Sequence, residues 1–271
     1  MSDGLVDSSA LKRDLAHLVM RPDGRPDLFV TALSNETYAL YHDDGEGLFS
    51  FVSVPSGVAE ATAPYAGWGT RWVDLDNDGW KDLFVAQGHV LDTIELTSDH
   101  LQYLQPPLLL RNVFGRFVRP SAVDRELSSK WAGRGTAFGD LDNDGDVDIV
   151  VATCGDRPHV LRNDGGNHAH WLSLSTAGTR SNRDGLGATI TVTGESGTQQ
   201  HFAVTTGSSY LSASDKRVHV GLGRDKSARS ITIRWPSGLE QTLRSVPADR
   251  ALTLKEIDAR QPDTALERKG R

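Results

Sequence analysis

The sequence has few of the features that mark disulfide-rich, membrane or nucleic-acid-binding proteins. Its 271 residues include one cysteine, Cys154, so no intrachain disulfide can form. No apolar run approaches the roughly 20 residues that a membrane helix needs. The N-terminal stretch has neither the basic region nor the apolar core of a signal peptide. The sequence also has no stripe of Lys and Arg residues, so nucleic-acid binding is not expected. As written, the chain is expected to be soluble and cytoplasmic, with no membrane insertion.

A nine-residue acidic motif occurs twice, as Asp74-Leu-Asp-Asn-Asp-Gly-Trp-Lys-Asp82 and as Asp140-Leu-Asp-Asn-Asp-Gly-Asp-Val-Asp148. Each copy has aspartates at positions 1, 3, 5 and 9 and a glycine at position 6, which permits a sharp turn. Ca²⁺ takes about 6–8 oxygen ligands, so the motif predicts two Ca²⁺ sites. The predicted ligands are the carboxylates of Asp74, Asp76, Asp78 and Asp82 with the carbonyl of Trp80, and the carboxylates of Asp140, Asp142, Asp144 and Asp148 with the carbonyl of Asp146.

Two other interpretations of the motif were weighed. An EF-hand needs a bidentate Glu at position 12 and a following helix, but position 12 is Val85 or Val151 and apolar strand-like runs follow at 83–86 and 149–152. An Asp/Asn/Gly turn that binds nothing is the second alternative. Two copies with four aligned carboxylates favour calcium over that alternative. The net charge of −7 would be +1 without these eight aspartates, so the acidity resides in the motifs.

The motif belongs to a larger repeat. Gly67-Trp-Gly-Thr70 and Gly133-Arg-Gly-Thr136 precede the two acidic stretches at the same offset. An eroded third copy spans residues 20–30, where Asp23, Gly24 and Asp27 remain but Val19 and Arg21 occupy positions 1 and 3, so no calcium is expected there. A period of roughly 50–65 residues built from short strands is typical of a propeller or solenoid. Residues 90–107 break the period and are interpreted as an insertion or loop.

A different pattern follows, in which apolar and polar residues alternate between Gly and Pro turns. The alternating segments are 171–175, 188–192, 201–205, 217–220, 230–235, 240–243 and 251–254. They predict an antiparallel sandwich or barrel of about 90 residues. The predicted domains are a poorly defined segment 1–19, propeller blades 20–162, a second module 163–257 and a disordered tail 258–271.

These residues resemble two known families. The stretch Thr136-Ala-Phe-Gly-Asp-Leu-Asp-Asn-Asp-Gly145 resembles the FG-GAP (VCBS-type) repeats of integrin-like β-propellers. Residues 163–254 resemble the ASPIC/UnbV domain through several segments in order, which include 178–187, 207–212, Val220-Gly-Leu-Gly223 and 233–238. The resemblance implies an all-β fold, with a partial β-propeller followed by a small antiparallel β-sandwich or barrel. Similar proteins, such as cartilage acidic protein and its bacterial relatives, are mostly extracellular calcium-binding propellers.

The chain departs from these relatives in blade number. A propeller of that type has about seven blades, whereas two intact blades and one eroded blade are visible here. An open array exposes apolar surface, which is typical of interaction sites. We therefore expect a homo-oligomer or a partner chain that completes the propeller.

No catalytic constellation stands out. Cys154 is expected to be a buried structural cysteine, and the His168-Ala-His170 pattern to mark a strand start rather than a transition-metal site. The polar loop 180–184 either binds an anion or sugar or only turns the chain. Tyr210 belongs to a family signature but has no general base beside it in the sequence.

The sequence therefore predicts a non-enzymatic, calcium-binding protein for protein or glycan recognition. The alternative is an accessory or catalytic protein in natural-product biosynthesis of the enediyne type, because the UnbV name also attaches to proteins encoded with such genes. A degraded paralogue with no role of its own is the third possibility.

Overall fold

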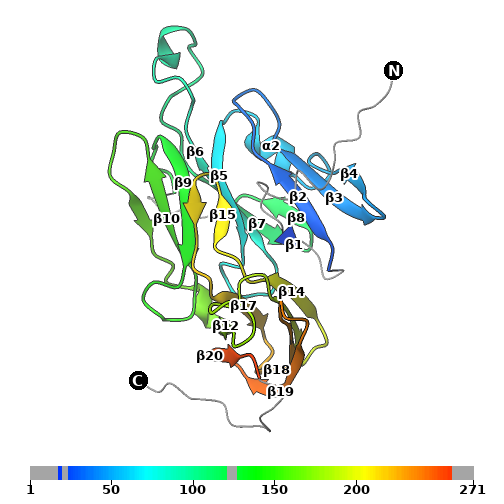
Figure 1. Ribbon diagram of the computed structural model, residues 1–271. Coiled ribbons are helices and arrows are strands. Elements are labelled where there is room, and N and C mark those ends of the chain that lie inside the picture. Colours follow the sequence, from blue (N-terminus) through cyan, green and yellow to red (C-terminus); the bar gives the residue numbers. More distant parts are fainter. Residues whose placement is uncertain (1–17, 20–23, 121–126, 258–271) are drawn as a thin grey trace.

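The computed structural model describes residues 18–19, 24–120 and 127–257, and these residues form an all-β structure (Figure 1). Most of the predicted N-terminal segment and the whole predicted tail 258–271 lie outside the described residues. The helical elements are α2 (Val58–Thr62), η1 (Ile94–Leu96) and η2 (Gly166–His168). Across the described part of the chain, no helix has the length and apolar character needed to cross a membrane.

Three antiparallel sheets follow one another along the first part of the chain. Blade 1 contains β1 (Leu18–Val19), β2 (Pro26–Val30), β3 (Ala39–Gly45) and β4 (Leu48–Phe51). Blade 2 contains β5 (Gly67–Val73), β6 (Asp82–Gln87), β7 (Leu108–Val113) and β8 (Arg116–Val118). Blade 3 contains β9 (Gly133–Gly139), β10 (Asp148–Thr153) and β11 (His159–Leu161). Each sheet keeps its strands in chain order, so the predicted partial propeller is confirmed.

Blade 2 is packed on both faces. Leu83 and Val85 of β6 join a core shared with blade 1, while Phe84 and Ala86 join a core shared with blade 3. All six residues of β6 are therefore buried, which confirms the buried strand expected from this apolar run. Within the described residues, blade 3 packs against blade 2 on one face, and Val160 on its other face is 55% exposed.

Glycine allows the first strands of blades 2 and 3 to approach closely. A Cβ added at Gly69 of β5 would lie 2.5 Å from the carbonyl oxygen of Arg134 in β9. The shared Gly-x-Gly-Thr segments thus lie side by side, and the glycine marks a close backbone approach. Residues 90–107 form a loop with the short η1, as expected.

The C-terminal module is a sandwich of two sheets. One sheet has the order β17 (Val218–Gly223), β12 (His170–Ala177), β20 (Arg250–Lys255), and the other has the order β14 (Gln199–Ala203), β13 (Thr189–Gly194), β18 (Ser227–Arg234), β19 (Glu240–Pro247). Leu172, Val220, Ile190 and Ile231 pack in the core between them. The seven predicted strands are confirmed, but β12 and β20 pair in parallel. Alternation along each strand sets its buried face and does not fix its direction.

A two-stranded segment of the module lies against the blades. It consists of β15 (Gly207–Ser209) and β16 (Ser212–Ala213), which pack on β5 and β9. Three serine hydroxyls accept backbone N–H groups of the blade strands: Ser209 Oγ from Thr70 (2.6 Å), Ser212 Oγ from Thr136 (2.9 Å) and Ser214 Oγ from Phe138 (3.1 Å). The module thereby satisfies backbone donors that an open propeller would leave unpaired.

The polar loop at 180–184 has a structural role. The backbone N–H groups of Thr179, Arg180 and Ser181 each donate to Glu256 Oε2 at 2.8 Å, and the hydroxyls of Ser181 and Ser237 donate to Oε1. Burial alone would raise the pKa of Glu256, but these hydrogen bonds outweigh it and lower the pKa to about 2. The anion that this loop holds is a carboxylate of the same chain.

Replacing Glu256 by Gln should lower the thermal stability, because an amide group cannot accept all five donors. We expect a loss of about 1–3 kcal/mol in the free energy of unfolding. Because the folded-state pKa is depressed, the stabilisation is present above about pH 4.5 and is lost as the pH falls towards 2. Chemical denaturation at pH 7 and pH 3 measures both effects. The exposed Glu240→Gln is the control, and equal stability of the two variants would contradict the assignment.

Candidate metal centre

The two acidic motifs form loops at equivalent places in adjacent blades. Loop 1 (residues 74–82) joins β5 to β6, and loop 2 (residues 140–148) joins β9 to β10. The asparagine at position 4 has a positive φ in both loops, 56° at Asn77 and 62° at Asn143, and so do Gly79 (91°) and Gly145 (100°). These left-handed residues curl each loop.

In loop 1 the structure brings three predicted ligands together. Asp74, Asp76 and Asp78 each offer a carboxylate oxygen, and the three atoms lie within 4.8 Å of one another. Asp74 Oδ1, Asp76 Oδ1 and Asp82 Oδ2 are buried and have no hydrogen-bond partner. Buried carboxylate oxygens without donors fit a bound hard cation.

In loop 2 the group consists of Asp140, Asp142 and Asp148, with oxygens again within 4.8 Å of one another. Asp144 lies outside this group, and its Oδ1 accepts the backbone N–H of Asp146 (3.2 Å). The sequence assigned only a carbonyl to Asp146, yet its side chain is buried and its Oδ1 has no partner. The carboxylate at position 7 of this motif copy was the sequence signal that could have identified Asp146 as a further side-chain ligand. The carbonyl ligands at Trp80 and Asp146 stay predictions.

Crowding and burial make these carboxyls poor acids. Burial raises the pKa of Asp74 to about 7 and that of Asp82 to about 8. Burial, reinforced by the neighbouring Asp144, raises the pKa of Asp146 to about 7. A bound cation would displace protons from these groups and remove their mutual repulsion.

The three blades have different basic residues at one equivalent position, and these residues have different acidic partners. In blade 1, which lost the first two acidic positions, His42 Nδ1 lies 2.7 Å from Asp27 Oδ1. In blade 2 Arg111 occupies the equivalent position, pairs with Asp76 and has its Nε 3.4 Å from Asp82 Oδ1. In blade 3 the equivalent Arg162 pairs with Asp164 instead, at 2.8 Å. Arg111 therefore pairs directly with a carboxylate of loop 1, whereas in loop 2 Arg162 lies near Asp142 and Asp144 without a direct ion pair. Arg217 likewise lies near Asp140.

The C-terminal module contacts loop 1 through the fully buried Asn77. Its Nδ2 donates to the carbonyls of Gly145 (2.9 Å) and Gly166 (3.0 Å), so its Oδ1 accepts from His219 Nε2 (2.7 Å). The Asn77 carbonyl also accepts the backbone N–H of Gly223 (2.7 Å). Burial, with Lys81 and Arg217 nearby, lowers the pKa of His219 to about 3, so the ring is neutral. One side chain thus joins both loops and β17.

Loop 2 makes a matching contact with the same strand region. Arg217 donates from Nη1 to Asn143 Oδ1 (2.8 Å) and from Nη2 to the carbonyl of Asp140 (2.5 Å). Its Nε pairs with Asp215 at 2.5 Å. The segment 215–223 therefore binds both acidic loops. Sequence reasoning missed this segment, although Gly221 within an apolar strand was a signal of close backbone approach.

Two glycines are required at this junction. A Cβ at Gly221 would collide with Asp74 Oδ2 and lie 2.6 Å from Asn77 Cα. A Cβ at Gly145 would collide with the indole of Trp171. Neither loop could meet the module with larger residues at these positions.

Among the other candidates, Cys154 is exposed rather than buried, because it lies one residue beyond the end of β10. His168 Nδ1 lies 2.8 Å from the carbonyl of Gly165, and His170 Nδ1 lies 2.8 Å from Asp249 Oδ2. These separate partners support a structural role for the His-x-His pattern. Trp72 and Trp131 are buried in the blade cores.

The replacement Gly221→Ala should loosen the module from loop 1, because its Cβ would displace Asp74. We expect a lower melting temperature and a higher rate of proteolysis between blades and module. Gly207→Ala is the matched control, because a Cβ there meets no atom within 4 Å. If both variants melt and cleave like the parent protein, the close contact between Gly221 and loop 1 is wrong.

The pH dependence of the metal-free protein provides a second test. Asp74 and Asp82 have pKa values of about 7 and 8 when folded, against about 4 in an unfolded chain. A raised folded-state pKa gives stability that is lost as the pH rises through that value. In chelator, the melting temperature should therefore fall between pH 5 and pH 8. A melting temperature that rises over this range would contradict the raised pKa values.

Comparison with protein families agrees with this architecture. An FG-GAP-like repeat model matches residues 22–85, which include β2 to β4 of blade 1, β5, loop 1 and most of β6. An ASPIC and UnbV model matches residues 178–261, which include the sandwich strands after β12. No curated protein matches the sequence. The chain therefore combines an FG-GAP-like repeat with a C-terminal ASPIC and UnbV domain.

Proposed function

We propose that this protein is a non-enzymatic, calcium-dependent recognition protein that binds a protein or glycan. One Ca²⁺ binds Asp74, Asp76, Asp78 and Asp82, and a second binds Asp140, Asp142, Asp144 and Asp148, with the carbonyls of Trp80 and Asp146 as further ligands. Oxygen-only donor sets of this kind suit a hard cation such as Ca²⁺. The buried carboxylate oxygens of loop 1 that have no hydrogen-bond partner support this assignment.

The observation that carries the proposal is the junction at Asn77. The residue lies inside loop 1, and its side chain bonds to loop 2 and to β17. Calcium that orders loop 1 would therefore also order the contact between the blades and the ASPIC and UnbV domain. The ions stabilise the contact between the blades and the ASPIC and UnbV domain, and recognition takes place on the surface that these two parts form together.

The extracellular setting that the resemblance implies agrees with such sites. Calcium sites of extracellular modules bind with dissociation constants of roughly 0.1–1 mM. A homo-oligomer or partner chain remains part of the proposal, because the outer face of blade 3 is open and Val160 on it is exposed. A partner there would cover the face that blade 4 covers in a complete propeller.

Replacing Asp142 by Ala should remove one of two bound calcium ions. Titration calorimetry should give two ions per chain for the parent protein and one for the variant. Calcium at 100 times its dissociation constant stabilises by about 2.7 kcal/mol per site, so the calcium-induced rise in melting temperature should also shrink. The control is Asp99→Ala, which removes an exposed aspartate outside both loops. An unchanged stoichiometry in Asp142→Ala would rule out loop 2 as a site.

A second candidate function is an accessory or catalytic role in natural-product biosynthesis. One observation favours it, a cavity of about 850 Å³ between the blades and the C-terminal module. Cavities of this size accommodate small molecules. Neighbouring polyketide synthase genes would favour this role, whereas neighbouring secretion or adhesion genes would favour recognition.

A further inference from the structure

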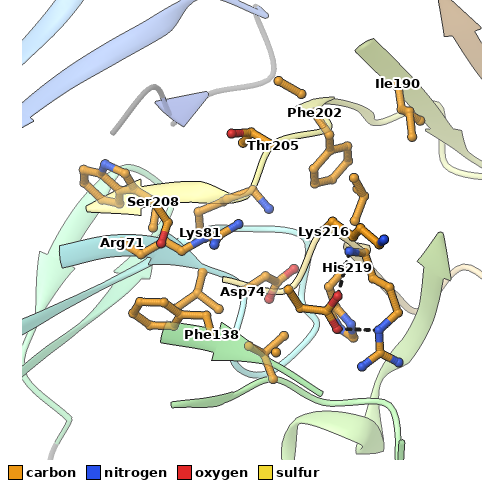
Figure 2. A pocket seen from close by; sticks show the side chains of 18 of the residues that line it. Arg71, Asp74, Lys81, Phe138, Ile190, Phe202, Thr205, Ser208, Lys216 and His219 are labelled. Atoms are coloured by element: carbon orange, nitrogen blue, oxygen red, sulfur yellow. Dashed lines mark hydrogen bonds and ion pairs between the residues drawn. The ribbon is translucent and has the colours of Figure 1, made fainter. Parts of the chain in front are cut away.

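The cavity between the blades and the C-terminal module has walls from both parts of the chain. Arg71 comes from β5, Lys81 from loop 1, Phe138 from β9, Phe202 from β14 and Ser208 from β15, and all five line the same space (Figure 2). Its volume is about 850 Å³. The cavity therefore exists only when the module is docked on the blades.

Two basic side chains of this wall lie near carboxylates without a direct ion pair: Asp215 lies near Arg71, and Asp74 and Asp82 lie near Lys81. Within the described residues, Arg71 and Lys81 form no ion pair, and no hydrogen bond is recorded for either side chain. Each instead lies against an aromatic ring: the Arg71 guanidinium is 5.7 Å from the centre of Phe138, and Lys81 Nζ is 4.5 Å from the centre of Phe202. Both side chains are partly buried.

The acidic groups nearby have other roles. Asp215 pairs with Arg217 at 2.5 Å. Asp74 accepts the backbone N–H of Gly79 through Oδ2, and its Oδ1 belongs to the calcium loop. A calcium ion bound to Asp74 would weaken the electrostatic attraction between this carboxylate and Lys81. The second lysine of the wall, Lys216, is already paired with Asp184 at 2.7 Å.

This arrangement leaves two basic side chains without a direct ion pair facing one partly enclosed space. Burial lowers the pKa of both, so an anion bound beside them would stabilise their charged forms. Arg71 and Lys81 are close enough to repel each other. A contact with an aromatic ring stabilises a cation only weakly, whereas taking a charge out of water is much more costly unless the charge is paired. A planar guanidinium beside an ammonium group is well suited to an incoming carboxylate, sulfate or phosphate.

We propose that the cavity binds a small organic anion, whose acidic group lies between Arg71 and Lys81. The side chains of Phe138, Phe202 and Ile190 provide an apolar wall for its body, while hydroxyl groups such as that of Ser208 line the other side. The lining thus combines apolar side chains for the body of a ligand with charged and hydroxyl groups for its acidic end. This ligand class goes beyond the proposed calcium-dependent recognition, because it is assigned to the cavity and not to the acidic loops.

The experiment uses the full chain in saturating calcium and five probes. Benzoate represents an aromatic acid, glucuronate an acidic sugar and sulfate a bare anion. Benzyl alcohol is the uncharged counterpart of benzoate, and glucose is that of glucuronate. Titration calorimetry should show that benzoate or glucuronate binds at least tenfold more tightly than its uncharged counterpart. Tighter benzoate would indicate an acidic metabolite, and tighter glucuronate would indicate an acidic glycan.

Two variants and one matched control test the residues. Arg71→Gln and Lys81→Gln should each weaken the binding of that anion about tenfold or more, because each removes a charged hydrogen-bond donor. Lys216→Gln should leave the affinity within about twofold, because this lysine is already paired within the chain. Melting curves and a calcium stoichiometry of two would show that the variants are folded and that the loops are intact.

Three results would overturn the proposal. The first is that neither benzoate nor glucuronate binds to the folded parent protein. The second is that the affinity is unchanged in both Arg71→Gln and Lys81→Gln. The third is that sulfate alone binds, with the same affinity in all variants, which would indicate adventitious anion binding. The calcium assignment is tested separately by Asp142→Ala, so either proposal can fail without the other.

Discussion

The rest of this structure depends on one constraint, which is that buried and crowded carboxylates at the junction between blades and module need charge compensation. Asp74, Asp76 and Asp82 have oxygens shielded from water without donors, which is unfavourable unless protons or a cation compensate for them. The same loop contains Asn77, which bonds to loop 2 and to β17. Charge compensation in the loops and the docking of the C-terminal module are therefore coupled.

This coupling explains how the three blades of the described residues are organised. Blade 2 has a core on each side, but the first strands of blades 2 and 3 would present unpaired backbone donors in an open array. The serines of segment 207–214 accept those donors, and segment 215–223 binds the acidic loops. The module thus closes one side of the array, and the cavity with Arg71 and Lys81 is formed by the same contact (Figures 1 and 2).

Local patterns in the sequence were sufficient for the strands, the three blades and the two loops, because alternation, turn residues and aspartate spacing act over a few neighbouring positions. Contacts between distant residues were not predictable in this way. Asn77 and His219 are 142 positions apart, the parallel pairing of β12 with β20 leaves no trace in alternation, and Glu256 fills a loop 75 positions away. The exposure of Cys154 depends on where β10 ends. Glycines in strands, such as Gly221, were the one local sign of these approaches.

Hydrogen exchange of the backbone amides tests most directly the claim that the acidic loops fasten the module to the blades. Exchange would be followed by mass spectrometry in calcium and in chelator, with β13 and β18 of the sandwich as an internal reference. The account predicts that chelation accelerates exchange in segment 207–223, including the Gly223 amide bound to Asn77, while β13 and β18 keep their protection. Equal protection of segment 207–223 in both conditions would contradict it.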